Sequence, residues 1–226
     1  MKKKNAKTIL VALGTLAAFA LWTFLIRCVD VQPIGPNGSR VGFAAINGAF
    51  HALTGVHWAL YTLTDWLGLV PIGIALGFAV LGLVQLIRRK SLLKVDRDIL
   101  ILGGFYIVVL AAYLLFETVV INFRPVLIDG KLEASYPSST TMLALCILPT
   151  AMMQLKTRIR SDAVRCAILG ILAAFTAFMV VGRLISGVHW LTDIIGGVLL
   201  SVGLVMLYAF ATKRQGKSRK NSLACV

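Results

Sequence analysis

The segment Gly182–Asp193, GRLISGVHWLTD, places an arginine, a histidine and an aspartate at fixed spacing where two apolar segments meet. His189 and Asp193 lie four residues apart, so if the chain is helical from Trp190 onward they share one face, and the carboxylate can hold an imidazole nitrogen and fix its tautomer. Arg183 precedes the Ser186–Gly187 break, and we expect it on the opposite side of the same turn. An oriented imidazole beside a guanidinium is suited to attack on a phosphate. The alternative is a packed, hydrogen-bonded histidine without a catalytic role.

The composition is that of a membrane protein. The chain has 226 residues, of which 58% are hydrophobic and 14% charged, and a mean hydropathy of +0.87, which excludes a soluble domain. The net charge of +14 raises the question of nucleic acid, but 18 of the 23 basic residues lie in four clusters at the ends of apolar segments. The clusters are Lys2, Lys3, Lys4 and Lys7; Arg88, Arg89, Lys90, Lys94 and Arg97; Lys156, Arg158, Arg160 and Arg165; and Lys213, Arg214, Lys217, Arg219 and Lys220. We interpret them as topology signals and anionic-lipid contacts, and expect no nucleic-acid partner.

The apolar segments predict an all-α, polytopic membrane protein that forms a single domain over residues 1–226. Six spans are expected, at residues 8–27, 67–87, 99–121, 139–155, 166–185 and 190–211. Six spans put every basic cluster, including the tail 212–226, on one side, which the positive-inside rule makes the cytoplasm. The segment 41–66 mixes apolar and polar residues, and we expect it at the outer interface. The four cysteines show no CxxC spacing, so neither a metal site nor a disulfide framework is expected.

Three polar strings reach the outer ends of these spans. FRP contains Arg124, YPSS contains Ser138 and Ser139, and the third is the segment around Arg183. Ionisable groups at membrane depth are costly and are usually kept for function. Two arginines can grip phosphate oxygens, and the free amides of a helix that starts near Ser139 favour an anion. These four residues are therefore the candidate phosphate-binding groups.

The strings resemble the motifs of the type 2 phosphatidic acid phosphatase family, integral-membrane lipid phosphatases related to vanadium haloperoxidases. That family carries a lysine, six residues and then Arg-Pro; next Pro-Ser-Gly-His; and last an arginine, five residues, a histidine, three residues and an aspartate. This chain has Arg124–Pro125, Pro137–Ser138–Ser139, and the complete third motif at Arg183, His189 and Asp193. The resemblance covers roughly residues 117–193. It implies a six-helix bundle, no metal or cofactor, and a phosphohistidine formed on His189, which Asp193 orients while Arg124 and Arg183 bind the phosphoryl oxygens.

Two positions depart from the family pattern. Glu117 stands where the family has its lysine, and Thr140 stands where the family has the histidine expected to protonate the leaving group. A threonine hydroxyl is too weak an acid for that task, and loss of general-acid help costs about 10²–10⁴ in rate. His57 or Glu117 are candidates to replace the acid; Glu117 is equally a candidate ion-pair partner of Arg124. Because a phosphate leaving group needs less protonation, a polyprenyl diphosphate should tolerate Thr140 better than a phosphatidate.

The sequence thus predicts a membrane enzyme, with both termini cytoplasmic, that hydrolyses a lipid phosphate or polyprenyl diphosphate at the extracytoplasmic face. Transfer of the phosphoryl group or headgroup to an acceptor other than water is a second prediction for the same fold. A non-catalytic protein that binds lipid phosphates or regulates another protein is the alternative from a different class. One short echo, TGVHW at 54–58 and SGVHW at 186–190, is either a coincidence or a shared structural role.

Overall fold

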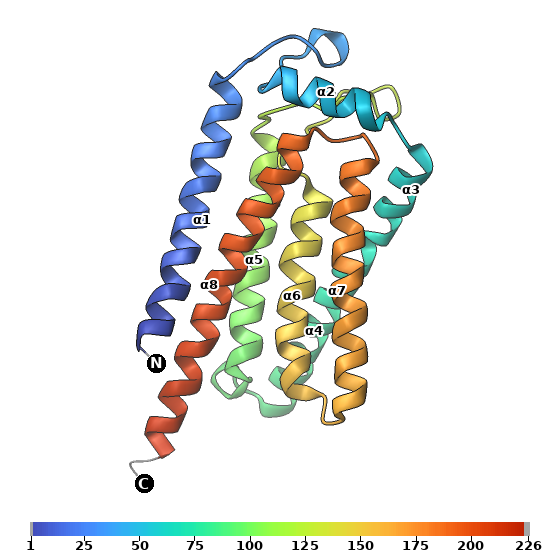
Figure 1. Cartoon of the computed structure of the whole chain (residues 1–226). Helices are drawn as coiled ribbons and strands as arrows, with labels where there is room; N and C mark the ends of the chain where they lie inside the picture. Colours follow the sequence, from blue (N-terminus) through green and yellow to red (C-terminus); the bar gives the residue numbers. More distant parts are fainter. Residues whose placement is uncertain (1, 224–226) are drawn as a thin grey trace.

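The computed structural model describes residues 2–223, with side chains described from residue 6 to residue 212. This part of the chain is almost entirely helical and forms one bundle (Figure 1), which confirms the predicted all-α fold class. The helices are α1 (Lys2–Cys28), α2 (Ala44–Thr54), α3 (Trp58–Leu67), α4 (Leu69–Arg89), α5 (Arg97–Thr118), α6 (Ser139–Arg158), α7 (Asp162–Ile185) and α8 (Leu191–Leu223), with short 3-10 helices at Pro36–Gly38 and Leu92–Lys94.

Five stretches of the described chain are long and apolar enough to cross a membrane. They are Ala6–Cys28, Trp58–Arg89, Arg97–Thr118, Asp162–Ile185 and Leu191–Thr212. Their number and length confirm the prediction of an integral membrane protein.

Helix α6, which corresponds to the predicted span 139–155, is not among these five stretches. It is nevertheless the middle helix of the bundle in Figure 1, where α4, α5, α7 and α8 surround it. Its buried residues include the polar Thr141, Thr150 and Gln154. A helix enclosed by other helices carries polar side chains at low cost because it presents little surface to lipid. A sixth span at α6 therefore stays a prediction, and its low apolarity reflects its central position.

The chain between the first and second predicted spans forms two helices. In Figure 1, α2 lies across the end of the bundle, as expected of an interfacial segment. The predicted interfacial segment extended to residue 66, whereas the structure joins α3 to α4 in the apolar stretch Trp58–Arg89. Gly68, between the two helices, keeps helical backbone angles (φ −59°, ψ −20°), so the chain continues without a sharp break. The second long apolar helix thus starts earlier than expected.

The connections between helices divide the molecule into two ends. The start of α1, the end of α8 and the α4–α5 and α6–α7 connections lie at one end in Figure 1, and these are the positions of the four basic clusters. Helix α2, the segment 119–138 and the α7–α8 turn lie at the other end. The strings FRP, YPSS and GRLISGVHWLTD are therefore all at the end opposite the basic clusters.

Packing against α1 and α8 holds the segment 119–138 in place. Phe123 and Ala134 form an isolated antiparallel bridge that closes the segment on itself. Tyr136 is 1% exposed, and its hydroxyl lies 2.7 Å from Thr23 Oγ1 of α1. A Cβ added to Gly196 of α8 would lie 2.3 Å from the Tyr136 ring, so only glycine lets the ring pack this close. These contacts fix a segment that has no regular secondary structure.

Candidate functional site

His189 lies in the α7–α8 turn, two residues before the start of α8. Since α7 ends at Ile185 and α8 begins at Leu191, His189 lies in the connection, and the prediction that it shares a helical face with Asp193 is wrong. Asp193 is the third residue of α8, and its Oδ2 accepts a hydrogen bond from the backbone N–H of Trp190 at 2.9 Å. A side chain that reaches back in this way caps the free N–H groups at a helix start. The carboxylate is therefore positioned by α8 itself.

The α7–α8 turn lies directly against the α2–α3 turn. Gly187 has φ of 71°, and a Cβ there would lie 1.9 Å from the backbone oxygen of Gly55, so a side chain at this position is excluded. The backbone N–H of His57 donates to the oxygen of Ser186 at 3.0 Å. The two strings TGVHW and SGVHW thus form two turns that touch each other.

Ser135 links His189 to Asp193. The Ser135 Oγ lies 3.1 Å from His189 Nδ1 and donates to Asp193 Oδ2, whereas the direct distance between Nδ1 and Oδ2 is 3.9 Å. Asn122 donates its amide to Asp193 Oδ1 at 3.3 Å. All four side chains are buried. The predicted contact between carboxylate and imidazole is therefore made mainly through a serine hydroxyl.

The hydrogen-bond roles follow from the chemistry of each group. The Asp193 carboxylate receives only donors, which is the pattern of the ionised form. Because Ser135 directs its proton to this carboxylate, its oxygen accepts from the Nδ1–H of His189. The lone pair of the imidazole then lies on Nε2, and Arg124 Nη1, which can only donate, lies 3.3 Å from that atom. One tautomer satisfies every contact.

His189 is held in its neutral form. Burial is the main cause that keeps its pKa well below the usual 6.5, and the positive charges of Arg124 and Arg183 act in the same direction. A hydrogen bond to the backbone of Ser135 acts in the opposite direction but does not prevail. A neutral imidazole with its lone pair on Nε2 is the form that acts as a nucleophile.

Arg124 reaches this histidine from the segment 119–138. Its backbone N–H donates to the oxygen of Glu133 at 3.0 Å, and its Nε lies 3.1 Å from the Glu133 carboxylate, although this N–H does not point at a hydrogen-bond acceptor. Since the Glu133 side chain is 42% exposed, the ion pair restrains the guanidinium only weakly. An ion pair between Arg124 and Glu117 was left open by the sequence; the structure pairs Arg124 with Glu133 instead.

Arg183 is buried between α7 and α3. Its Nη1 lies 3.5 Å from the backbone oxygen of Tyr61 and 3.4 Å from Thr64 Oγ1, and its Nη2 lies 3.5 Å from the Asp65 carboxylate. The guanidinium also sits 5.0 Å from the centre of the Tyr61 ring. These contacts are long, and Nε has no hydrogen-bond partner. A buried guanidinium with long contacts keeps donors for an anion.

The start of α6 adds further free donors. Ser138 precedes the helix, its hydroxyl makes no capping hydrogen bond, and its backbone N–H donates to the oxygen of Asp193 at 3.2 Å, which sets α6 beside α8. The first N–H groups of a helix have no partner within the helix and attract anions. Six buried side-chain polar atoms in the described chain have no hydrogen-bond partner, and four belong to this region: Arg124 Nε, Ser138 Oγ, Thr141 Oγ1 and Arg183 Nε.

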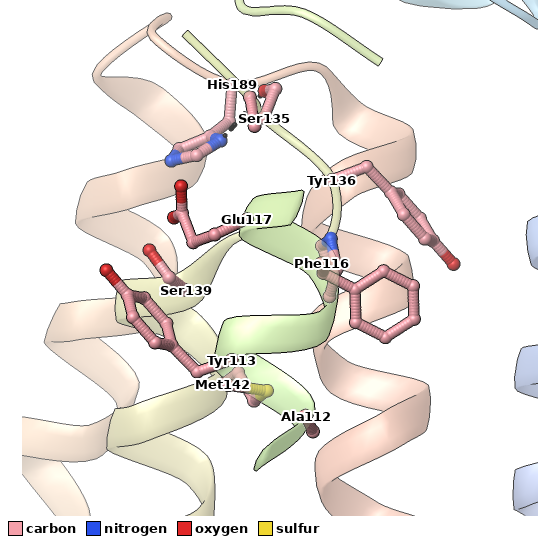
Figure 2. Close-up of a pocket in the computed structure, with 11 residues that line it drawn as sticks. Ala112, Tyr113, Phe116, Glu117, Ser135, Tyr136, Ser139, Met142 and His189 are labelled. Atoms are coloured by element: carbon pink, nitrogen blue, oxygen red, sulfur yellow. Dashed lines mark hydrogen bonds between the residues drawn. The ribbon is translucent and has the colours of Figure 1, made fainter. Parts of the chain in front are cut away.

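A small pocket opens beside His189 between α5, the segment 134–137 and α6. It is lined by Ala112, Tyr113, Phe116, Glu117, Ala134, Ser135, Tyr136, Pro137, Ser139, Met142 and His189. Figure 2 shows the carboxyl group of Glu117 directed toward the His189 ring, with the Ser139 hydroxyl on the same side of the pocket. Within the described chain, no three His, Cys, Asp or Glu side chains are grouped to hold a metal ion.

Thr140 and His57 do not line this pocket. The Thr140 side chain faces the α3–α4 junction, where its Cγ2 lies 3.5 Å from the position of a Cβ added to Gly68. His57 is exposed, and the hydrogen bond that joins it to the α7–α8 turn comes from its backbone. Of the candidates for a leaving-group acid, Glu117 is the one that shares the pocket with His189.

Three groups that complete the site were not predicted. Ser135 and Glu133 lie in a segment without helix or strand periodicity, and Asn122 lies at the start of that segment. Their positions depend on the bridge that folds residues 119–138 back on themselves, and no spacing in the sequence indicates it. The one available signal was the position of Ser135, two residues before Pro137 of the second motif.

Comparison with known proteins identifies one family. The model of the PAP2 superfamily matches residues 98–217, more than half of the chain, and this range contains His189 and its hydrogen-bond partners Arg124 and Ser135. No curated protein gives a significant match. Among solved structures, the chain is similar to the crystal structure of a transmembrane PAP2 type phosphatidylglycerolphosphate phosphatase from Bacillus subtilis. The sequence identity is 20%, the TM-score is 0.49, and the alignment covers 91% of this chain and 96% of that one.

Proposed function

The chain belongs to the PAP2 superfamily, as its motifs indicated, and from that premise we propose that it is a membrane phosphatase that removes a phosphoryl group from a lipid. One observation carries the proposal. His189 is buried and neutral, its Nδ1 is held by Ser135, and its Nε2 lone pair faces the guanidinium of Arg124. An oriented lone pair beside donors that stabilise charge on the attacked group is what nucleophilic catalysis requires.

In the first step, Nε2 of His189 attacks the phosphorus atom. The Nε2–P bond forms as the P–O bond to the lipid breaks, and the departing oxygen takes up a proton. The Nδ1–H bond to Ser135, backed by Asp193, stabilises the positive charge that grows on the ring. Arg124 turns its donors from Nε2 to a phosphoryl oxygen, and Arg183 with the start of α6 supplies the others.

In the second step, water attacks the phosphohistidine. The O–P bond from water forms as the Nε2–P bond breaks, the electron pair of the broken bond returns to Nε2, and the water gives up a proton to solvent. Inorganic phosphate leaves, and the neutral imidazole keeps its proton on Nδ1. The same donors from Arg124, Arg183 and α6 stabilise both transition states, because the phosphoryl group stays in place while its two partners exchange. Transfer to a lipid alcohol in place of water would use the same geometry.

The site offers no histidine that could protonate the leaving oxygen. Thr140 replaces the family histidine and faces the α3–α4 junction, so proton donation falls to solvent or to Glu117. This favours a good leaving group such as the phosphate of a polyprenyl diphosphate. The carboxylate of Glu117 opposes that choice, because it would lie beside the second phosphate. The rates of phosphate release from a polyprenyl diphosphate and from a phosphatidate show which effect is larger, the lower need for a proton donor or the repulsion by Glu117.

We further propose that the site faces the outside of the cell and that both termini are cytoplasmic. The support is the division of the bundle into a basic end and an opposite end with the site. The basic end would then contact anionic lipids of the inner leaflet.

Phosphate release by the purified, detergent-solubilised protein tests the proposal. The wild type should hydrolyse at least one of the two lipids, and His189→Ala should lower the rate by roughly 10³-fold or more, as removal of a nucleophile does. A covalent phosphate label should be trapped on the wild type and be missing from His189→Ala. His57→Ala is the matched control, since His57 is exposed in the similar string TGVHW, and it should keep the wild-type rate.

Two results would replace the proposal by its alternatives. An inert wild type in which Thr140→His creates turnover would indicate a protein that binds lipid phosphates without hydrolysing them. Faster appearance of phosphate on an added lipid alcohol than in solution would indicate a transferase.

A further inference from the structure

The start of α8, which carries Asp193, is held by a side chain from α2. Asn47 is fully buried, and its Oδ1 accepts a hydrogen bond from the backbone N–H of Thr192, the residue before Asp193, at 3.2 Å. We propose that Asn47 is a positioning residue for catalysis. It caps α8 from another helix, so that the Asp193 carboxylate stays on Ser135 and fixes the tautomer of His189. The proposal rests on the phosphatase function proposed above and adds a residue to the support of the same site.

The partners of the Asn47 amide define its orientation. Nδ2 donates to the backbone oxygen of Gly42 at 2.8 Å and to Thr192 Oγ1 at 3.0 Å, whereas Oδ1 faces the N–H of Thr192. A flipped amide would set oxygen against oxygen at Gly42 and N–H against N–H at Thr192, so one orientation satisfies every contact. Gly42 in turn packs on α1, where an added Cβ would collide with the backbone oxygen of Ile26. The cap is therefore anchored to α1 as well as to α2.

Thr192 is also held by α1, which lies along α8 in Figure 1. The indole N–H of Trp22 donates to the Thr192 backbone oxygen at 3.1 Å, and the Trp22 ring stacks on Phe43, directly before α2, with ring centres 5.1 Å apart. The N–H, the hydroxyl and the carbonyl of one residue are thus bound from two other helices. Asn47 and Trp22 lie outside residues 98–217, the range that the family model matches. This support of α8 is therefore separate from the family motifs.

A Thr192 N–H without a cap would compete for the Asp193 carboxylate. The first N–H groups of a helix have no partner within the helix, and an acidic side chain in the first turn commonly accepts from them. Asp193 already does this at Trp190, with the same Oδ2 that accepts from Ser135. A buried N–H without a partner costs free energy, and a turn of the carboxylate toward it would break the bond to Ser135. Because Asn47 takes up this N–H, the carboxylate is not drawn away.

The first test measures kcat and KM for phosphate release with the detergent-solubilised full-length protein. Asn47→Ala should lower kcat by about 10–10²-fold, the loss that a small misplacement of catalytic groups causes. KM should stay nearly unchanged, because Arg124, Arg183 and the start of α6 keep their contacts. A wild-type kcat in Asn47→Ala would overturn the positioning role.

Gln154→Ala is the matched control. Gln154 is another buried amide that bonds α8, since its Nε2 donates to the Tyr208 hydroxyl at 2.6 Å, but it lies near the far end of α6. It also bonds Asp98 and Arg158, so its removal deletes at least as many hydrogen bonds as Asn47→Ala. Gln154→Ala should lower the unfolding temperature comparably and keep the wild-type kcat. A similar fall of kcat in both variants would mean that any loss of packing slows the enzyme, which would overturn the positioning role.

Asn47→Asp is the conservative variant. It keeps the size of the side chain and an oxygen for the Thr192 N–H, and it loses the donors to Gly42 and to the Thr192 hydroxyl. It should recover most of the kcat lost in Asn47→Ala, although its unfolding temperature should stay below that of the wild type. If Asn47→Ala does not fold, Asn47→Asp decides alone. A kcat near the wild-type value then supports the cap, and a loss of roughly tenfold or more overturns it.

The protonation of the His189 ring tests the same role without turnover. The chain has three histidines, so nitrogen-15 labelling of the rings gives few NMR signals, and His189→Ala identifies those of His189. The wild type should show a proton fixed on Nδ1, whereas Asn47→Ala should show exchange between the two tautomers. If this difference is seen in a protein that releases no phosphate, the positioning role stands although the phosphatase proposal has failed. A proton fixed on Nδ1 in both proteins would overturn the positioning role.

Discussion

The two nitrogen atoms of His189 face environments of opposite kind. On the Nδ1 side, Ser135, Asp193 and Asn122 satisfy one another with hydrogen bonds. On the Nε2 side lies the guanidinium of Arg124, with Nη1 at 3.3 Å. We group with it Arg183 and the start of α6, the other predicted phosphate-binding groups, because buried polar atoms in all three have no hydrogen-bond partner. Both sides are buried, so burial alone does not explain the difference.

The difference indicates which groups stabilise the folded protein and which bind a ligand. Buried polar atoms without partners destabilise a folded protein, and natural chains keep few of them. The buried donors without hydrogen-bond partners in Arg124, Arg183 and the start of α6 are therefore best explained by an anion that completes them. It follows that substitutions on the Nδ1 side should lower both stability and activity, whereas substitutions on the Nε2 side should lower activity alone.

The largest effect is expected from Asp193→Asn on the Nδ1 side. The carboxylate accepts from Trp190, Ser135 and Asn122, and an amide nitrogen at either position would face donors. We expect the rate to fall by about 10³–10⁴-fold, as when the orienting carboxylate of a catalytic histidine is lost. We also expect the free energy of unfolding to fall by about 2–4 kcal/mol. Phosphate release and thermal unfolding in detergent measure the two effects.

Asp98→Asn is the control for this prediction. Asp98 pairs with Arg158 at the opposite end of the bundle, and its side chain is 42% exposed. Loss of such a pair costs at most about 1 kcal/mol and should leave the rate unchanged. A variant Asp193→Asn as stable as the wild type would show that the Nδ1 side does not support the fold.

A smaller effect is expected from Ser135→Ala, which removes the hydroxyl between the imidazole and the carboxylate. His189 Nδ1 and Asp193 Oδ2 are 3.9 Å apart, too far for a hydrogen bond, so the tautomer would be less firmly held. We expect a loss of about 10–10²-fold in kcat and roughly 1–2 kcal/mol of stability, the range of one hydrogen bond to a charged group. The control is Ser201→Ala. It removes a buried serine hydroxyl of α8 that is bonded to the backbone oxygen of Met142, and it should leave kcat unchanged. Equal kcat values for Ser135→Ala and wild type would refute the bridging role.

Regular patterns in the sequence predicted one part of this arrangement. Apolar segments predicted the helical membrane fold, and the spacing of Arg183, His189 and Asp193 brought these residues to one turn, as the structure has them. The helical face that His189 and Asp193 were expected to share does not exist, because α8 starts only at Leu191. The spacing that suggested a shared face reflects instead a carboxylate that caps the helix it belongs to.

The irregular segment 119–138 was beyond prediction from the sequence. Ser135 reaches His189 only because the chain folds back between Phe123 and Ala134, and single-residue bridges leave no periodic pattern. The pairing of Arg124 with Glu133 depends on the same fold. Motif spacing thus singled out Arg183, His189 and Asp193, whereas the contacts made by Ser135, Asn122 and Glu133 required the structure.

The smallest effect, and the sharpest test of the comparison, is expected from Ser138→Ala on the Nε2 side. Loss of a serine before a helix usually destabilises the protein, but the Ser138 hydroxyl is fully buried, makes no capping hydrogen bond and has no partner. Removing an unpaired buried hydroxyl should leave stability unchanged or raise it by up to about 1 kcal/mol. An anion held by that hydroxyl would bind severalfold more weakly, measured as inhibition of the phosphatase by inorganic phosphate. Ser135→Ala also removes one serine hydroxyl, but from the Nδ1 side. Ser135→Ala should therefore lower the unfolding temperature, whereas Ser138→Ala should leave it unchanged or raise it. A clear loss of stability in Ser138→Ala would mean that both sides of His189 serve the fold alike.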